Sequence, residues 1–217
     1  MKQTAKIVPQ DRLYLSDNEY EIPILRIDRQ PETGLLMPFA PWGANARRRS
    51  HVGTIHFYVD DYRFNNIWLH PEKLIYTGCR EVVEPNFSLF QTTPIAYGLQ
   101  LLYKKRLYKK RWIARWLQEC GIRVWVDLNV APKFRELNKL GVPRGYNAFA
   151  TRGHEGELCH LEAEWQIAKE ISGVETPNMI VYGGGETCKS FCRQRGLIYI
   201  DPYQVDQRKS RKEVDNG

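Results

Sequence analysis

Polar or glycine-rich residues follow four of the predicted β-strands, at the point where each strand ends. The strands are expected at residues 54–59, 122–126, 146–150 and 179–182, and the clusters after them are Asp60-Asp61, Asp127, residues 151–154 and Gly183-Gly184-Gly185. When strands alternate with helices, ligands bind outside the carboxyl ends of the strands. We therefore expect a binding or catalytic site where these strand ends meet.

The aspartates at the strand ends carry the side chain that a hard cation prefers. Mg²⁺ is usually bound by one or two carboxylates together with water and substrate phosphates, so Asp61 and Asp127 are the candidate catalytic and metal-binding residues, with Glu84 as a further acid. Such an ion would polarise the phosphoryl oxygen of a phosphodiester and activate water. The alternative is that Asp60 and Asp61 cap the helix expected to start at Tyr62.

The loop after residues 146–150 combines a cation with an imidazole. Arg152 can hold a phosphate through two parallel hydrogen bonds, and His154 can act as general acid or base. His154, Cys159 and His160 do not match the ligand spacing of a structural zinc site. A surface loop without a catalytic role is the alternative.

The glycine run at Gly183, Gly184 and Gly185 lies between a predicted strand and a predicted helix. Main-chain N–H groups in such a turn, together with a helix N-terminus, make an anion site, so we expect a phosphate there. No glycine directly precedes Lys189, so the nucleotide-binding P-loop pattern is absent. A tight connection that needs backbone freedom is the alternative.

A strongly basic stretch with two aromatic residues covers residues 104–115. Its cations can neutralise phosphates while exposed aromatic rings stack on unpaired bases. The candidate nucleic-acid-binding residues are Lys104, Lys105, Arg106, Lys109, Lys110, Arg111, Trp112 and Arg115, with a second group at Arg47, Arg48 and Arg49. The alternative is a solvated helix face whose aromatic side chains belong to the core.

The composition favours a globular protein with an acidic partner. The 217 residues carry a net charge of +7, and the sequence pI is about 9.1, which favours nucleic acid, a nucleotide or another anionic partner. No apolar run is long enough for a membrane span, and the first residues lack the apolar core of a signal peptide. Five cysteines without a tight pair favour a reduced, cytoplasmic setting.

The order of the predicted elements is typical of the α/β class. Helices expected at residues 62–70, 93–120, 132–140, 157–171 and 186–195 alternate with the four strands above and with further strands at residues 22–27, 81–83 and 197–200. This alternation predicts a mostly parallel sheet, either an open doubly wound sheet or a partial or degenerate barrel. We expect an irregular segment at residues 1–53, one α/β domain at 54–200 and a disordered polar tail at 201–217.

Four sequence blocks, taken in order, resemble a known family. Residues 56–64 (HFYVDDYRF), 85–89 (PNFSL), 111–121 (RWIARWLQECG) and 181–183 (VYG) are similar to the blocks of the domain-of-unknown-function 4417 family. The resemblance implies a bacterial, phage or mobile-element setting, with the host cytoplasm as the location if the chain is phage-encoded, and a single α/β domain. The biochemistry of the family is not established, so no catalytic residue is carried over from it. Asn86 stands where we associate an aspartate with the family, so Asp61 and Asp127 are the preferred candidate acids.

These features together predict a phage or mobile-element protein that handles nucleic acid or nucleotides at the carboxyl ends of its strands. In the enzymatic version, Asp61 and Asp127 hold Mg²⁺, Arg152 and the glycine turn position phosphate, and His154 transfers a proton. Three other functions stay open: a non-catalytic nucleic-acid-binding factor in replication or packaging, an inhibitor that binds a host protein through residues 38–49, and a small-molecule enzyme on a barrel-like scaffold.

Overall fold

The chain folds around one parallel β-sheet. The computed structural model describes residues 12–32, 34–43, 53–87 and 106–202. The strands are β1 (Phe39–Pro41), β2 (Thr54–His56), β3 (Glu81–Val83), β4 (Arg123–Asp127), β5 (Phe149–Arg152), β6 (Met179–Tyr182) and β7 (Ile198–Ile200). Neighbours in the sheet are neighbours in the sequence, and every pair is parallel. A doubly wound sheet reverses its order at a switch point, so this unbroken order confirms the partial-barrel form.

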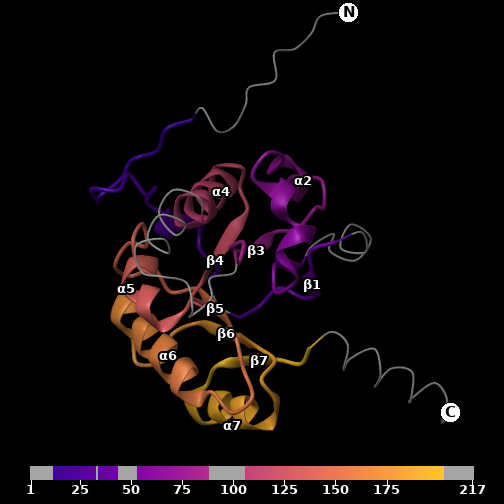
Figure 1. Cartoon of the computed structure of the whole chain (residues 1–217), viewed down its shortest axis with the longest axis vertical. Helices are drawn as coiled ribbons and strands as arrows, with labels where there is room; N and C mark the ends of the chain where they lie inside the picture. The colour runs from indigo at the N-terminus through magenta and orange to yellow at the C-terminus, as the bar shows by residue number, and fades with distance from the viewer. Residues whose placement is uncertain (1–11, 33, 44–52, 88–105, 203–217) are drawn as a thin grey trace, which may run out of the picture.

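Helices and short helical turns connect the strands and lie outside the sheet (Figure 1). The α-helices are α2 (Glu72–Ile75), α4 (Tyr108–Glu119), α5 (Arg135–Asn138), α6 (Leu158–Ser172) and α7 (Gly185–Arg195). The 3-10 turns are η2 (Ile27–Arg29), η3 (Asp61–Arg63), η4 (Asn65–Ile67) and η6 (Pro132–Phe134). Because α4 packs on β4, α6 on β5 and α7 on β7, the outer face of the sheet is shielded from water.

The sheet curls into a half-barrel, which brings side chains of its first and sixth strands together. The ring of Tyr182 on β6 lies 5.8 Å from Phe39 on β1, 4.6 Å from His56 on β2 and 5.6 Å from Tyr58 just after β2, measured between ring centroids. Successive side chains of a strand point to opposite faces, so Thr54, His56 and Tyr58 share the concave face. The interior of the half-barrel is therefore lined by aromatic rings at its carboxyl end.

The first strand of the sheet is not the predicted one. Residues 22–27 form no strand, so that prediction is wrong; the side chain of Gln118 instead accepts from the N–H of Arg26 at 2.7 Å and donates to its carbonyl at 3.0 Å. These bonds satisfy backbone groups that a neighbouring strand would otherwise satisfy. Strand β1 lies in the region predicted as a loop, and the sheet thus begins upstream of residue 54.

Two predicted helices differ from the observed elements. The helix expected at residues 62–70 is instead the two turns η3 and η4, and α2 begins directly after Pro71. Proline is tolerated at a helix start because the first N–H groups of a helix have no internal partner. Within the predicted helix 93–120, α4 covers Tyr108–Glu119. Residues 93–105 and the predicted disordered tail from residue 203 onward lie outside the described residues.

Candidate functional site: the carboxyl end of the sheet

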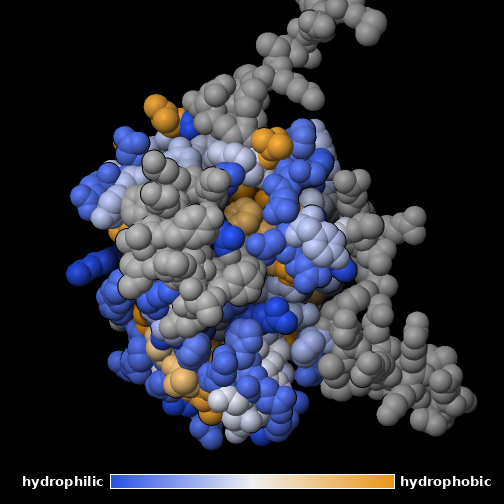
Figure 2. Space-filling view, in the orientation of Figure 1, coloured by the Kyte–Doolittle hydropathy of each residue, from blue (hydrophilic) through white to orange (hydrophobic). Residues whose placement is uncertain are grey.

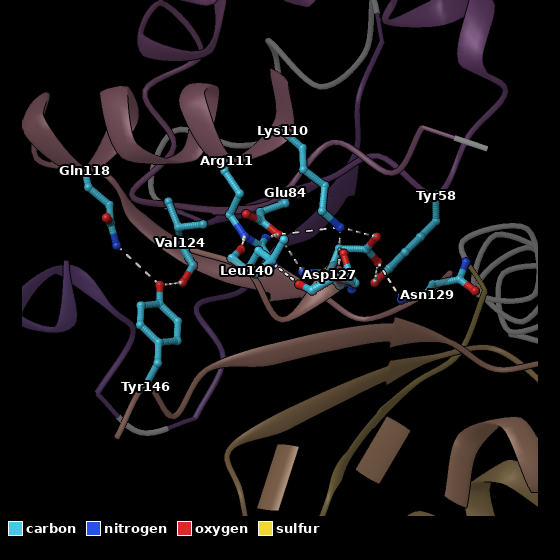
Figure 3. Close-up of polar contacts among 11 residues, drawn as sticks. Tyr58, Glu84, Lys110, Arg111, Gln118, Val124, Asp127, Asn129, Leu140 and Tyr146 are labelled. Carbon is cyan, nitrogen blue, oxygen red and sulfur yellow. Dashed lines mark hydrogen bonds and ion pairs between the residues drawn. The ribbon is translucent and has the colours of Figure 1, made fainter. Parts of the chain in front are cut away.

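Helix α4 directs two cations toward the carboxyl ends of β3 and β4 (Figure 3). The guanidinium of Arg111 donates to the Glu84 carboxylate just after β3 and to the carbonyl oxygens of Asn138 and Leu140, the last at 3.0 Å. Arg111 and Glu84 are both fully buried. A buried arginine keeps its charge, so its pairing with Glu84 joins α4, the end of β3 and the region around α5.

Lys110, the neighbouring residue on α4, reaches the end of β4. Its ammonium donates to the main-chain oxygen of Asp127 at 3.0 Å and lies 3.6 Å from Asp127 Oδ2 and 3.8 Å from Glu84 Oε2. The N–H of Asp127 donates to Glu84 Oε2 at 3.1 Å. Two carboxylates and two cations therefore share one buried volume with no net charge, which we call the ionic cluster (Glu84, Lys110, Arg111 and Asp127).

Tyr58 connects the ionic cluster to the concave face of the sheet. Its hydroxyl donates to Asp127 Oδ1 at 3.1 Å, and the N–H of Asn129 approaches the same oxygen at 3.4 Å. Asp127 Oδ2 and Glu84 Oε1 are buried without a hydrogen-bond donor in the described part of the chain. Buried polar atoms are normally hydrogen-bonded, so these two oxygens retain unused capacity to accept a hydrogen bond inside the protein.

A small cavity lies beside the ionic cluster. It has a volume of about 10 Å³, which is room for a single water molecule, and Lys110, Asn138, Asn86 and Phe87 are among its lining residues. The side-chain oxygen of Asn138 is buried and has no donor among the described residues. The cavity therefore lies between the ionic cluster and the region around α5.

Burial changes the ionisation of these groups. It raises the pKa of Asp127 to about 6, with Lys110 acting in the opposite direction. Burial also lowers the pKa of Lys110, and burial together with the Asp127 charge raises that of Tyr58 well above its ordinary value. At neutral pH, Tyr58 is thus a hydrogen-bond donor, and Asp127 is ionised but close to the pH at which it takes up a proton.

His56 lies next to this group and was not predicted as a site residue. Its Nδ1 accepts from the N–H of Tyr58 at 3.3 Å, so the proton of the neutral ring sits on Nε2, which is buried without a partner among the described residues. Burial lowers the pKa of His56 to about 3, so the ring stays neutral. The alternation of Thr54 and His56 on β2 with Tyr58 just after it was the sequence signal that these side chains share a face.

The predicted phosphate-binding residues on β5 and β6 lie together. Arg152 ends β5 in register with Tyr182 of β6, and the N–H of Gly153 donates to the Tyr182 carbonyl at 3.0 Å, directly before the glycine turn. Arg152 and His154 are exposed. Burial lowers the pKa of His154, and the positive charge of Arg152 lowers it further. An exposed arginine, a neutral imidazole and a glycine turn therefore lie at the carboxyl ends of β5 and β6. We call the carboxyl edge of the sheet the carboxyl rim; the ionic cluster occupies its part at β3 and β4, and these residues occupy its part at β5 and β6.

Close packing accounts for a glycine in the predicted phosphate turn. Gly184 has φ +90°, and a Cβ there would lie 2.4 Å from Cys188 Sγ and 2.8 Å from the carbonyl carbon of Gly153. At Gly185, a Cβ would lie 3.7 Å from the carboxylate of Glu155, so one acid of the chain already lies near the start of α7. The turn is thus a tight connection, and its binding of phosphate stays a prediction.

The two predicted catalytic acids, Asp61 and Asp127, lie in different environments. Asp127 is buried, whereas Asp61 is half-buried at the start of η3. The Asp60 side chain makes no capping hydrogen bond and instead lies 3.9 Å from the guanidinium of Arg63.

The described residues contain no group of three or more His, Cys, Asp or Glu side chains placed to hold a metal. The ammonium of Lys110 would repel a second cation at Asp127. Magnesium stays a prediction.

The prediction of an exposed basic helix is wrong for three of its residues. Lys110, Arg111 and Trp112 are buried. The first two pair with carboxylates, and the ring of Trp112 packs against that of Trp68, with ring centroids 5.3 Å apart. Arg115 is half-buried and donates to the Ile24 carbonyl at 3.0 Å. The remaining candidates are Arg106 and Lys109, which are half-buried, and Lys104, Lys105, Arg47, Arg48 and Arg49, which lie outside the described residues.

The fold and the rim define a parallel α/β half-barrel protein with a buried ionic cluster and an exposed arginine at the carboxyl ends of its strands. The chain belongs to the family described as "Domain of unknown function (DUF4417)", whose model matches residues 14–154. This confirms the resemblance seen in the sequence blocks. In the described part of the chain, every helix is too short or too polar to cross a membrane.

Two relatives are phage proteins. The Gene 1 protein of Mycobacterium phage D29 is 32% identical over 209 residues, which cover 93% of this chain and 73% of the relative. The Gene 1 protein of Mycobacterium phage L5 is 33% identical over 115 residues, which cover 50% of this chain and 46% of the relative. No solved structure matches the chain.

Proposed function

We propose that the chain is a phage nucleic-acid-associated protein that binds phosphate groups at the carboxyl ends of β5 and β6. The observation that carries this proposal is the exposed Arg152 at the end of β5, directly beside the glycine turn that opens α7. Arginine suits this role because its planar guanidinium matches a phosphate with two parallel hydrogen bonds. Main-chain N–H groups at the start of α7 would add to the attraction for an anion.

The charge of the protein and its relatives support the same function. A net charge of +7 attracts polyanions and raises their rate of association. The two relatives are proteins of phages, which is consistent with the predicted phage setting. His154 lies two residues after Arg152 and would stay neutral at pH 7, so it is available to donate to or accept from the ligand.

The test compares two exposed arginines at opposite ends of β5. Arg152 lies at its carboxyl end and Arg144 in the loop that precedes it. We expect Arg152→Gln to weaken binding of a labelled oligonucleotide about tenfold at low salt and to lower the slope of log affinity against log salt by about one. Arg144→Gln removes the same charge and should change affinity less than about threefold.

Fluorescence anisotropy across a salt series, with magnesium or EDTA present, measures both quantities. Equal effects of the two substitutions would show that only net charge matters and would contradict a site at the carboxyl rim. Absence of salt-dependent binding to any single- or double-stranded DNA or RNA probe would contradict the proposed function itself.

A second candidate function, phosphodiester or nucleotide hydrolysis by acid–base catalysis, is favoured by Asp127. Its Oδ2 is buried without a donor in the described residues, and its pKa of about 6 lies near the working pH of a general base. Asp127→Asn should abolish turnover of a nucleotide or oligonucleotide substrate, with circular dichroism as the control for folding. Full turnover in that variant would exclude Asp127, and turnover that EDTA abolishes would support the predicted magnesium ion.

A further inference from the structure

The 3-10 turn after β2 carries an exposed aromatic side chain on a rigid base. Tyr62, in η3, has 71% of its surface exposed. The next but one residue, Phe64, is 1% exposed and packs against Phe57 and Phe87, with ring centroids 5.2 and 5.3 Å apart. Phe87 follows the carboxyl end of β3, so this packing places η3 at the same rim of the sheet as Arg152.

Trp42, which follows β1, also holds the backbone of η3 in place. Trp42 donates its indole N–H to the Arg63 carbonyl at 3.1 Å and stacks on Phe57 at 5.7 Å. The backbone of η3 is therefore held from both sides, by residues that follow β1 and β3. Because the backbone is held, an exposed ring on this turn needs little further ordering when a ligand stacks on it.

Arg63 supports the ring of Tyr62 from one side. Its guanidinium carbon lies 5.8 Å from the ring centroid, its Nε approaches the Tyr62 hydroxyl at 3.4 Å, and Asp60 lies 3.9 Å from the same guanidinium. No other aromatic ring in the described residues stacks on Tyr62. An exposed aromatic ring beside an arginine is the arrangement with which proteins stack unpaired bases and hold the adjoining phosphate.

We propose that Tyr62 and Arg63 form a stacking platform for an unpaired base, so that the ligand of the carboxyl rim is single-stranded nucleic acid. This inference rests on the proposed function, because it specifies the ligand of the rim that Arg152 lines. Bases within a duplex are stacked on one another and cannot use the ring of Tyr62, whereas every unpaired base has a free face. The platform therefore provides a preference for single strands over duplexes with little dependence on sequence.

The chain contains a matched control at the opposite end of the sheet. Tyr76 is 78% exposed and is the C-cap residue that follows α2, directly before the segment that enters β3 at its amino end. Replacing either tyrosine by alanine removes an exposed ring of the same size, so neither substitution should disturb the core. Only Tyr62 lies at the rim that contains Arg152.

The experiment measures binding of Tyr62→Ala, Tyr62→Phe and Tyr76→Ala to three probes by anisotropy or competition. The probes are an oligothymidylate of about 12 nucleotides, a duplex of similar length and inorganic polyphosphate. We expect Tyr62→Ala to weaken binding of the oligothymidylate about tenfold and of the other two probes less than about twofold. Tyr62→Phe should restore the affinity, because it keeps the ring, and Tyr76→Ala should have no effect.

The possible outcomes separate the two proposals. If the wild-type protein binds none of the nucleic-acid probes, the proposed function fails. If Arg152→Gln weakens binding but Tyr62→Ala behaves like Tyr76→Ala, the proposed function stands and the stacking platform is wrong. An equal loss for oligothymidylate, duplex and polyphosphate in Tyr62→Ala would also overturn the platform, since stacking cannot act on polyphosphate.

Discussion

The two halves of the carboxyl rim use the same position in the sheet in different ways. At the ends of β3 and β4, the charged side chains are buried and paired inside the ionic cluster. At the end of β5, Arg152 is exposed. The difference arises because α4 lies over the first half and directs Lys110 and Arg111 into it. Charged residues after parallel strands can thus stabilise the fold in one half and remain available to a ligand in the other.

The largest effect should come from breaking the ionic cluster. Arg111→Met leaves Glu84 as a buried carboxylate without its closest partner, and we expect a loss of about 3–5 kcal/mol in the free energy of unfolding. The control is Arg123→Met, which removes an exposed pair with Glu32 and should cost less than about 1 kcal/mol. Urea unfolding measures both. Equal losses would show that the cluster stabilises the fold no more than a surface pair does.

The next largest effect separates packing from backbone strain in the glycine turn. Gly184 and Gly185 both have positive φ, so alanine at either position costs about 1–2 kcal/mol. Only at Gly184 would the new Cβ collide with Cys188 Sγ, and we expect Gly184→Ala to cost about 2 kcal/mol more than Gly185→Ala. Thermal or urea unfolding of the two variants gives the difference. If Gly185→Ala lowers the free energy of unfolding more than Gly184→Ala does, the close contact between Gly184 and Cys188 of α7 does not constrain the turn.

A smaller effect concerns the titration of Glu164, a buried acid that accepts from Thr151, whereas the buried acid Asp127 faces the ammonium of Lys110. Burial raises the pKa of Glu164 on α6 from 4.5 to about 8, and its Oε2 accepts from Thr151 at 2.6 Å. A folded-state pKa above the unfolded value means that the folded protein binds the proton more tightly, so stability falls as pH rises from about 4.5 to 8.

Between pH 7 and 8, the wild-type protein should therefore lose about 1 kcal/mol of stability through Glu164. Glu164→Gln keeps an acceptor for Thr151 without titrating, so its stability should fall less over the same interval. Urea unfolding at both pH values checks this, and identical slopes in the two proteins would show that Glu164 does not hold a proton in the folded state.

The smallest effect concerns the exposed half of the rim. Arg152→Gln should change the free energy of unfolding by less than about 0.5 kcal/mol, because its side chain is exposed. It should nevertheless raise the pKa of His154, since the charge of Arg152 lowers it. An NMR titration of the histidine ring protons measures the shift, with Arg144→Gln as control. An unchanged pKa would place Arg152 too far from His154 for the two to share a ligand.

Much of the fold could be predicted from local patterns. Strands β3 and β6 have the predicted bounds, and β4, β5 and β7 overlap their predicted segments, because alternating apolar and β-branched residues between turn signals specify a strand without reference to its neighbours. Strand β1 was missed, since it has only three residues and ends at Pro41, so that it resembles a loop when it is considered alone. The strand order, and hence the half-barrel, could not be separated from a doubly wound sheet by these patterns.

The candidate site could be predicted only in part. The sequence indicated that Asp127, Arg152 and the glycine turn follow strands, and the structure places the last two side by side. The sequence pattern wrongly placed Lys110 and Arg111 on an exposed surface, because a run of cations within a helical pattern is usually solvated. Their burial depends on Glu84 and on Asp127, which are far from α4 in the sequence and meet it only in the folded structure.

The sequence by itself thus determined the type and order of most elements from residue 54 onward, the net charge and the residues that follow those strands. The tertiary structure alone decided which of those residues are paired in the core and which face solvent. The physical reason is that the type of an element depends on residues near one another in the chain. The burial of a charge, by contrast, requires an opposite charge supplied by another element, as Glu84 is for Arg111.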